Sequence, residues 1–298
     1  MQIGVSIIHS SVIIMTPLLL AALGGLFTEL TGMLNIALEG LLLFGAFFGI
    51  LGTYYTSSIF LGVCCGIVGS MVLSALLATI TLNLKANVFI TGLAANLFAS
   101  GVTVVLAFKL FKNKGVLVFD TIPSLPVYSI PLIKDIPVLG SLFSGYSAFV
   151  YISWLLLLIG YLVLEKTVFG FRLRATGLNA QALASLGLRE NRYRFIAFLI
   201  SGFTCGIGGA MLTLNLGAFV PNITAGKGWI ALVVIFLGNK KPVGLLVASL
   251  VFGLSDAFSN YAQGAFNIPS DFILAIPYVV TLVAMLGYSV FEKKKNTI

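Results

Sequence analysis

The stretch Gly170 to Arg194, GFRLRATGLNAQALASLGLRENRYR, interrupts a chain that is otherwise almost continuously apolar. It holds five arginines, which are all the arginines of the 298-residue chain. Charged side chains are costly in a hydrocarbon layer, so a chain that crosses a membrane keeps most of them in segments outside it. The stretch therefore indicates a surface outside a bilayer, between long segments that cross the bilayer.

The composition places the whole chain in the membrane class. Hydrophobic side chains make up 59% of the residues and charged ones 9%, with a mean hydropathy of +1.10, whereas about 25% charged residues are usual in a soluble domain. Several apolar segments reach the roughly 20 residues that a helix needs to cross about 30 Å of hydrocarbon. Their irregular apolar pattern favours helices over the alternating strands of a barrel.

We expect an all-α polytopic membrane protein, a bundle of about 8–10 transmembrane helices with some short or broken segments, in a single domain over residues 1–298. Its apolar segments lie at about 5–27, 33–54, 59–82, 88–110, 147–169, 195–218, 226–238, 243–262 and 270–291. The seventh is short, because only Trp229 to Leu237 is cleanly apolar. Such a half-helix is stable at membrane depth where it packs against protein or lines a water-filled path.

The basic residues predict the orientation. If residues 170–194 lie in the cytoplasm, twelve Lys and Arg residues fall on the cytoplasmic side and five on the other. The positive-inside rule then places this loop and the C-terminus inside and the N-terminus outside. The net charge of +8 therefore reflects topology rather than nucleic-acid binding, since no stripe of basic and aromatic residues marks a soluble face.

The connection at about residues 112–146 is expected on the outer face. Its prolines at positions 123, 126, 131 and 137 prevent a regular helix. Two interpretations remain open: a docking surface for an external partner, or a solvated connector.

Small residues inside the apolar segments predict close helix packing. Glycines recur four residues apart in Gly45xxxGly49, Gly62xxxGly66 and Gly202xxxGly206, a spacing that lets helices approach within a bilayer. Cys64, Cys65 and Cys205 also lie in apolar segments without a CxxC pattern. We therefore expect packing thiols and no metal site.

Polar side chains inside the apolar segments are the candidates for a solute path. Glu39 lies four residues from Asn35, so in a helix both would share one face. A carboxylate among Leu and Phe needs a partner or water. Glu39 is thus either part of a path or a hydrogen-bonded strut between helices. The candidate path residues are Asn35, Glu39, Asn96, Trp229, Asp256 and Asn260.

The motifs of several enzyme classes are missing. Gly226-Lys227-Gly228 lacks both the earlier glycine and the Ser or Thr of a Walker A sequence. There is a single histidine, His9, and neither HExxH nor GxSxG occurs. We expect a protein that is not an enzyme and has no ATPase activity of its own.

The arginine stretch itself predicts a short capped helix. Asn179 is a good N-cap, Ala180 to Leu186 gives about two turns, and Gly187 suits the left-handed position after a helix. The flanking arginines can contact lipid phosphates or acidic groups of a partner protein. The capped helix between them favours docking of a partner.

Three motifs occur in order: GMLNIALEG at Gly32–Gly40, FRLRATGLN at Phe171–Asn179 and AGKGWIAL at Ala225–Leu232. Together with Leu237-Gly238 and Lys241-Pro-Val-Gly244, they resemble the membrane permeases of bacterial ABC importers. The match covers about residues 28–286 and is most similar to the nucleoside and simple-sugar branch, which is related to the ribose and branched-chain amino acid permeases.

This resemblance implies a multi-pass subunit of the bacterial cytoplasmic membrane. Its implied partners are a second homologous permease, ATP-binding cassette ATPase subunits that use the ATP and Mg²⁺, and an external substrate-binding lipoprotein. The chain itself would bind no cofactor. The family's Arg-x-x-Gly-x-Asn region forms a cytoplasmic coupling element, and the coupling residues implied here are Arg172, Arg174, Thr176, Gly177, Asn179, Ala182, Leu186 and Gly187.

The Asn-Ile-x-x-Glu-Gly segment is typical of nucleoside-type members, so the resemblance implies a purine nucleoside as solute. Riboflavin or a simple sugar such as ribose remain alternatives, although Lys240-Lys241 fills a loop that sugar permeases often make glycine-rich. Two other classes stay open. A secondary transporter driven by an ion gradient would use Glu39 and Asp256, and a lipid-modifying membrane enzyme would need a cluster of Asp or His that the sequence does not show.

Overall fold

The computed structural model describes residues 2–119, 122–129, 143–265, 279 and 283. Within this part, the helices long and apolar enough to cross a membrane are α1 (Gln2–Leu30), α2 (Leu38–Thr56), α3 (Ile59–Leu82), α4 (Val88–Phe111), α6 (Ala148–Lys166), α9 (Glu190–Leu216) and α11 (Pro242–Ala265). Three shorter helices are α7 (Val168–Leu178), α8 (Ala180–Ser185) and α10 (Lys227–Leu237). The prediction of an all-α polytopic membrane protein is confirmed. The expected segment 270–291 lies almost wholly outside the described residues.

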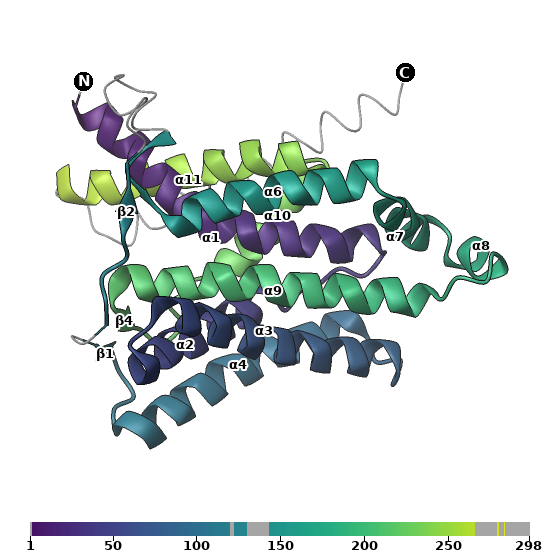
Figure 1. Ribbon diagram of the computed structural model, residues 1–298, viewed down its shortest axis with the longest axis horizontal. Coiled ribbons are helices and arrows are strands. Elements are labelled where there is room, and N and C mark those ends of the chain that lie inside the picture. The colour runs from purple at the N-terminus through teal and green to yellow at the C-terminus, as the bar shows by residue number, and fades with distance from the viewer. Residues whose placement is uncertain (1, 120–121, 130–142, 266–278, 280–282, 284–298) are drawn as a thin grey trace.

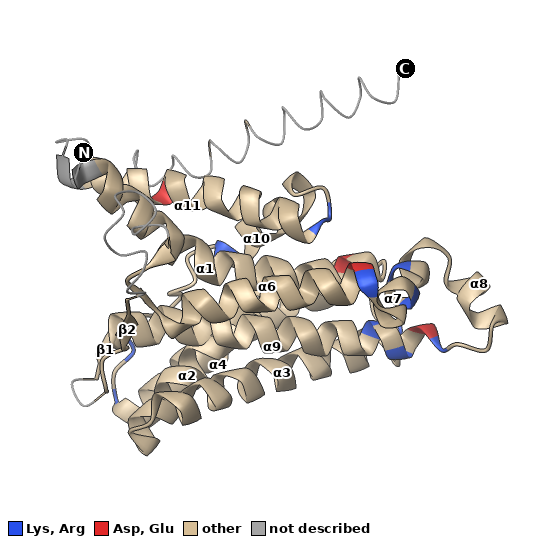
Figure 2. Cartoon of the chain, turned by 45° about the horizontal axis from the view of Figure 1, so that its top comes forward, with Lys and Arg blue, Asp and Glu red and all other residues tan. Residues whose placement is uncertain are grey.

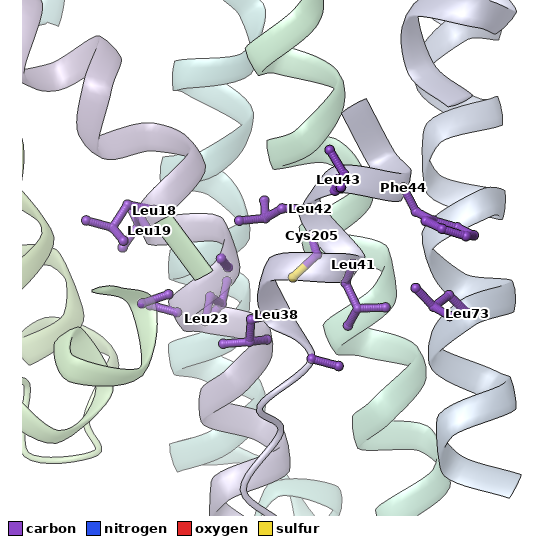
Figure 3. Packing of buried hydrophobic residues seen from close by; sticks show 14 of the residues in the cluster. Leu18, Leu19, Leu23, Leu38, Leu41, Leu42, Leu43, Phe44, Leu73 and Cys205 are labelled. Carbon is purple, nitrogen blue, oxygen red and sulfur yellow. The ribbon is translucent and has the colours of Figure 1, made fainter. Parts of the chain in front are cut away.

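Helix α1 lies at the centre of the bundle, in contact with α6, α9, α10 and α11 (Figure 1). From Met15 to Phe27 its side chains are almost all apolar, which is the pattern of a helix segment buried on every side. Leu19, Leu20 and Leu26 are completely buried. Figure 3 shows leucines of α1 and α2 together with Cys205 of α9, a buried free thiol. The core is therefore formed where these three helices meet.

Helices α2, α3 and α9 touch backbone to backbone through their glycines. A Cβ atom added to Gly45 would lie 2.8 Å from the Cα atom of Gly206, and one added to Gly66 would lie 2.7 Å from the carbonyl oxygen of Gly45. Both separations are too short for real Cβ contacts, so only glycine fits. The glycine spacing thus serves packing within this chain, as the sequence predicts.

By contrast, α3 and α4 expose much of their apolar surface. Phe60, Val68, Leu97 and Val105 are each more than half exposed. Large apolar side chains facing outward along two spanning helices are the pattern expected for contact with lipid or with another membrane protein.

The two ends of the bundle differ. At one end, β1 (Leu117–Val118) pairs antiparallel with β4 (Ala218–Phe219), and β2 (Val127–Tyr128) pairs antiparallel with β3 (Tyr146–Ser147). At the opposite end α7 and α8 project beyond the other helices (Figure 1). We call these the strand end and the α8 end. The predicted connection 112–146 belongs to the strand end, and its residues 120–121 and 130–142 lie outside the described residues.

The arginine stretch is more helical than the sequence predicts. It was expected to be a loop with one short helix, but α7 already begins at Val168 and α9 at Glu190. The reason for the first is Thr167, whose extended backbone ends α6 and whose hydroxyl accepts a hydrogen bond from the Gly170 amide at 3.2 Å. A side chain that caps the first turn allows a new helix to start directly after the break.

Candidate functional site

The predicted capped helix is present at the α8 end. The Asn179 side chain accepts a hydrogen bond from the Ala182 amide at 3.0 Å, and Gly187 has a φ of +75°. Helix α8 ends at Ser185, and Leu186, expected as its last residue, is the C-cap. Leu178 and Leu186 are 88% and 76% exposed. Large exposed leucines on both sides of a short projecting helix form a surface suited to contact another protein.

Helix α7 packs tightly against the end of α1. A Cβ atom added to Gly177 would lie 2.9 Å from the Gly32 amide nitrogen and still closer to the Leu30 carbonyl oxygen. Gly32 itself has a φ of +78°, which favours glycine. Thr176 is buried, and its hydroxyl donates to the Arg172 carbonyl oxygen at 2.8 Å. The role of Gly177 is therefore close contact between backbones.

Lysine and arginine residues gather around α7 and the start of α9 (Figure 2). Some of these arginines are tied to the bundle itself. Arg174 forms an ion pair with Glu165 of α6 at 3.2 Å, and Arg172 donates to the Tyr193 hydroxyl at 3.4 Å. Arg189 and Arg192 are exposed. The surface available to a partner is thus built from Arg189, Arg192 and α8 more than from Arg174.

Residues Glu29 to Gly32, here called the α1 junction, connect α7 to other elements at the α8 end. Glu29 pairs with Lys240, in the turn between α10 and α11, at 2.7 Å. The carbonyl oxygen of Thr31 accepts from Nε of Arg194 on α9 at 3.5 Å. Since Gly177 packs on Leu30 and Gly32, the α1 junction joins α7, α9 and the α10–α11 turn.

The chain leaves the α1 junction through a non-helical segment, residues 33–37, before α2 begins at Leu38. The expectation that Asn35 and Glu39 share one helical face is therefore wrong. Asn35 is buried, and its amide donates to the Ser201 hydroxyl of α9 at 2.9 Å and accepts from the Ala37 amide at 3.1 Å. Asn35 shapes the turn before α2 and binds that turn to α9.

Glu39 instead binds the start of α10. Its Oε1 atom accepts hydrogen bonds from the Thr224 hydroxyl at 2.6 Å and the Gly226 amide at 2.8 Å, and its Oε2 atom accepts from the Gly228 amide at 2.6 Å. These amides precede or begin α10, where exposed N–H groups and the helix dipole favour a negative charge. Glu39 is a strut between α2 and α10.

Close approach makes this contact possible. A Cβ atom on Gly228 would lie 2.8 Å from Oε2 of Glu39 and closer still to the Glu39 backbone. Gly226 has a φ of +80°. Thr224, Gly226 and Gly228, which hold the Glu39 carboxylate, are not among the residues predicted from the sequence. The signal that could have found them is the pair of glycines directly before a short apolar helix.

Helix α4 is attached to the same region. Asn96 accepts a hydrogen bond from the Gly40 amide at 2.8 Å and donates to the Ile36 carbonyl oxygen at 3.0 Å. One turn further on, the Ser100 hydroxyl donates to Oδ1 of Asn222 at 2.9 Å. Asn96 therefore satisfies backbone groups next to Glu39, and Ser100 extends the connection to the segment before α10.

The six predicted path residues do not form one group. Glu39, Asn96 and Trp229 lie around the start of α10, where Trp229 is 41% exposed. Asp256 and Asn260 lie on α11, and Asn260 lines a cavity of about 350 Å³ between α1 and α11. No group of three or more His, Cys, Asp or Glu residues that could hold a metal ion occurs in the described part of the chain.

Comparison with known proteins supports the fold and places the chain in a family. A family model described as "Branched-chain amino acid transport system / permease component" matches residues 7–286. The chain is similar in fold to "PsaBC from Streptococcus pneumoniae in complex with Fab", with a TM-score of 0.50, 14% identity, and coverage of 93% of this chain and 89% of that one.

Curated relatives align over nearly the full length. The "Nucleoside ABC transporter permease protein NupC" of Lactococcus lactis subsp. cremoris is 31% identical, over 96% of this chain and 94% of the relative. The "Guanosine ABC transporter permease protein NupQ" of Bacillus subtilis is 32% identical, over 96% and 93%. The "Putative glucose ABC transporter permease protein TsgC13" of Haloferax volcanii is 30% identical, over 88% and 79%. The chain belongs to the family of branched-chain amino acid transport system permease components.

Proposed function

We propose that the chain is the transmembrane permease subunit of an ATP-binding-cassette importer and that its solute is a purine nucleoside. The observation that carries this proposal is its similarity, at more than 30% identity and nearly full length, to permeases named for nucleoside and guanosine transport. The bundle of spanning helices with one short helix, α10, is consistent with it, because short helices at membrane depth often border a solute path.

The proposed coupling surface is α8 with its flanking residues. An ATPase subunit seated on the exposed leucines and arginines there would move α7, to which α8 is joined at Asn179. Helix α7 rests on the α1 junction through Gly177. Residues 33–37 lead from that junction to Glu39 of α2, whose carboxylate binds the start of α10. Displacement of α7 can thus reach α10 through a continuous set of close contacts.

The full assembly would contain a second homologous permease, the ATPase subunits and an external substrate-binding lipoprotein, in the bacterial cytoplasmic membrane. The α8 end then faces the cytoplasm, together with the C-terminus, and the strand end faces outward with the N-terminus. The excess of basic residues at the α8 end supports this orientation. The permease binds no cofactor and performs no covalent chemistry, since ATP and Mg²⁺ are used by the ATPase.

A sugar is the second candidate solute, because TsgC13 bears the name of a putative glucose permease. Riboflavin is the third. Uptake of labelled guanosine, riboflavin and ribose by cells carrying this chain with its cognate ATPase and binding protein separates them. Competition of guanosine uptake by unlabelled purine nucleosides, but not by ribose or riboflavin, is the expected result. If labelled ribose were taken up and labelled guanosine were not, the proposed solute would be contradicted.

The same cells test the alternative of an ion-coupled transporter. Uptake that stops on ATP depletion and continues with an uncoupler is expected. The reverse pattern would favour a secondary transporter that uses Asp256. The carboxylate of Glu39 suits that role less, because three hydrogen-bond donors of the chain already hold it.

A further inference from the structure

A charged cavity lies at the α8 end and adjoins the coupling surface. It has a volume of about 430 Å³ and is bounded by the loop between α3 and α4, the start of α9 and Met33. Lys85 and Arg194 line it, with Glu190 as the acidic residue in its wall. Apolar side chains of Leu82 and Val88 complete the lining. The cavity therefore has both charged and apolar side chains in its wall.

Among the residues that the structure describes, neither cation of this cavity forms an ion pair. The ion pairs in the described part of the chain join Arg174 to Glu165 and Lys240 to Glu29, and neither Lys85 nor Arg194 belongs to them. Arg194 is half-buried and is held by its Nε atom on the Thr31 carbonyl oxygen. Its other guanidinium nitrogens remain available as donors. Against one carboxylate, two cations leave an excess positive charge that an anion would balance.

Exposed apolar side chains are adjacent in sequence to the lining residues Lys85 and Val88. Leu84, Phe89 and Ile90, at the adjoining ends of α3 and α4, are 73%, 54% and 66% exposed. Large apolar side chains exposed next to the end of a spanning helix are the pattern expected for contact with lipid or with another membrane protein. Helix α8 projects beyond the ends of α3 and α4 (Figure 1), so a soluble protein resting on α8 meets the chain farther from the bilayer than this cavity.

We propose that the cavity binds the headgroup of an anionic phospholipid. Its phosphate would lie between Lys85 and Arg194, and its acyl chains would run along the exposed apolar faces of α3 and α4. Basic cavities between spanning helices are the type of site that binds such headgroups. A carboxylate from a soluble partner would match the charge as well, but it would leave Leu84, Phe89 and Ile90 facing water.

The test uses the full chain in nanodiscs and a fluorescent phosphatidylglycerol as probe, titrated in a phosphatidylcholine background. The double variant Lys85→Gln with Arg194→Gln should bind the probe at least about tenfold more weakly than wild type. Arg192→Gln is the matched control, because it removes an exposed cation from the same helix turn outside the cavity. The charge-conserving double variant, Lys85→Arg with Arg194→Lys, should retain most of the binding.

Several outcomes would overturn the proposal. Equal weakening by Arg192→Gln would show attraction to the surface charge in general. Displacement of the probe by millimolar inorganic phosphate would show a site for the free ion. If the double glutamine variant lost binding of the ATPase but not of the probe, the cavity would belong to the protein partner. If the charge-conserving variant, with an unchanged thermal midpoint, bound as weakly as the double glutamine variant, charge would not be the cause.

Discussion

Replacement of Glu39 tests the contact between α2 and α10 most directly. In Glu39→Ala the Thr224 hydroxyl and the amides of Gly226 and Gly228 lose their common acceptor. A hydrogen bond to a charged group contributes about 1.5–3 kcal/mol, and an unsatisfied buried donor costs about 1–3 kcal/mol. The site is part-buried, so water can bond to some of the donors that lose the carboxylate. We therefore expect a loss of about 1 kcal/mol per hydrogen bond, or about 3 kcal/mol for the three.

Amide hydrogen exchange measures this loss at the groups concerned. A loss of about 3 kcal/mol raises the local opening equilibrium by roughly two orders of magnitude, so the Gly226 and Gly228 amides should exchange about 100-fold faster in Glu39→Ala. Glu39→Gln keeps one acceptor oxygen and should fall between wild type and Glu39→Ala. The protein exchanges in detergent or nanodiscs, and mass spectrometry of peptides that cover residues 224–230 measures the exchange.

Glu165→Gln is the matched control. Glu165 is also paired, with Arg174, but both side chains are about one third exposed, and such surface pairs contribute about 0–1 kcal/mol. Its variant should leave exchange at residues 224–230 unchanged. Wild-type exchange rates in Glu39→Ala would refute the argument that the carboxylate holds α10 in place, and so would an equal acceleration in Glu165→Gln.

Three further predictions concern the α8 end. Gly177→Ala should abolish coupled uptake and destabilise the chain by about 1–3 kcal/mol, because the added Cβ meets the backbone of the α1 junction. The control is Gly101→Ala, whose added Cβ has no atom within 4 Å and which should keep the thermal midpoint and uptake of wild type. Equal uptake in the two variants would contradict the proposed contact. Asn179→Ala should lose about 1 kcal/mol of helix capping and lower solute uptake per ATP hydrolysed in a reconstituted assay. Asn179→Ser keeps a capping hydroxyl and should restore both. If the serine variant transported as poorly as the alanine variant, the cap would not be the cause of the loss. A maleimide-reactive thiol in Ser185→Cys should be labelled only from the cytoplasmic side of right-side-out and inverted vesicles, and labelling from outside would invert the orientation.

The sequence by itself determined the features that depend on neighbouring residues. Apolar segments of about 20 residues predicted the spanning helices, because each must satisfy its own backbone hydrogen bonds in a bilayer. The short apolar run from Trp229 predicted the short helix α10. Asn179 predicted the start of α8, and Gly187 predicted its end to within one residue. Its ordered motifs also identified the family. Caps, helix lengths and local spacing are encoded within one turn or one span.

Only the tertiary structure decided which polar groups meet. Glu39 lies 185 residues from Thr224 in sequence, and no local pattern shows that its carboxylate binds the start of α10. The local pattern suggested a partnership with Asn35 that the break before α2 removes. The contact of Gly177 with the α1 junction and the cavity between Lys85 and Arg194 also depend on helices that are distant in sequence. Packing brings these groups together, and packing is a property of the whole bundle.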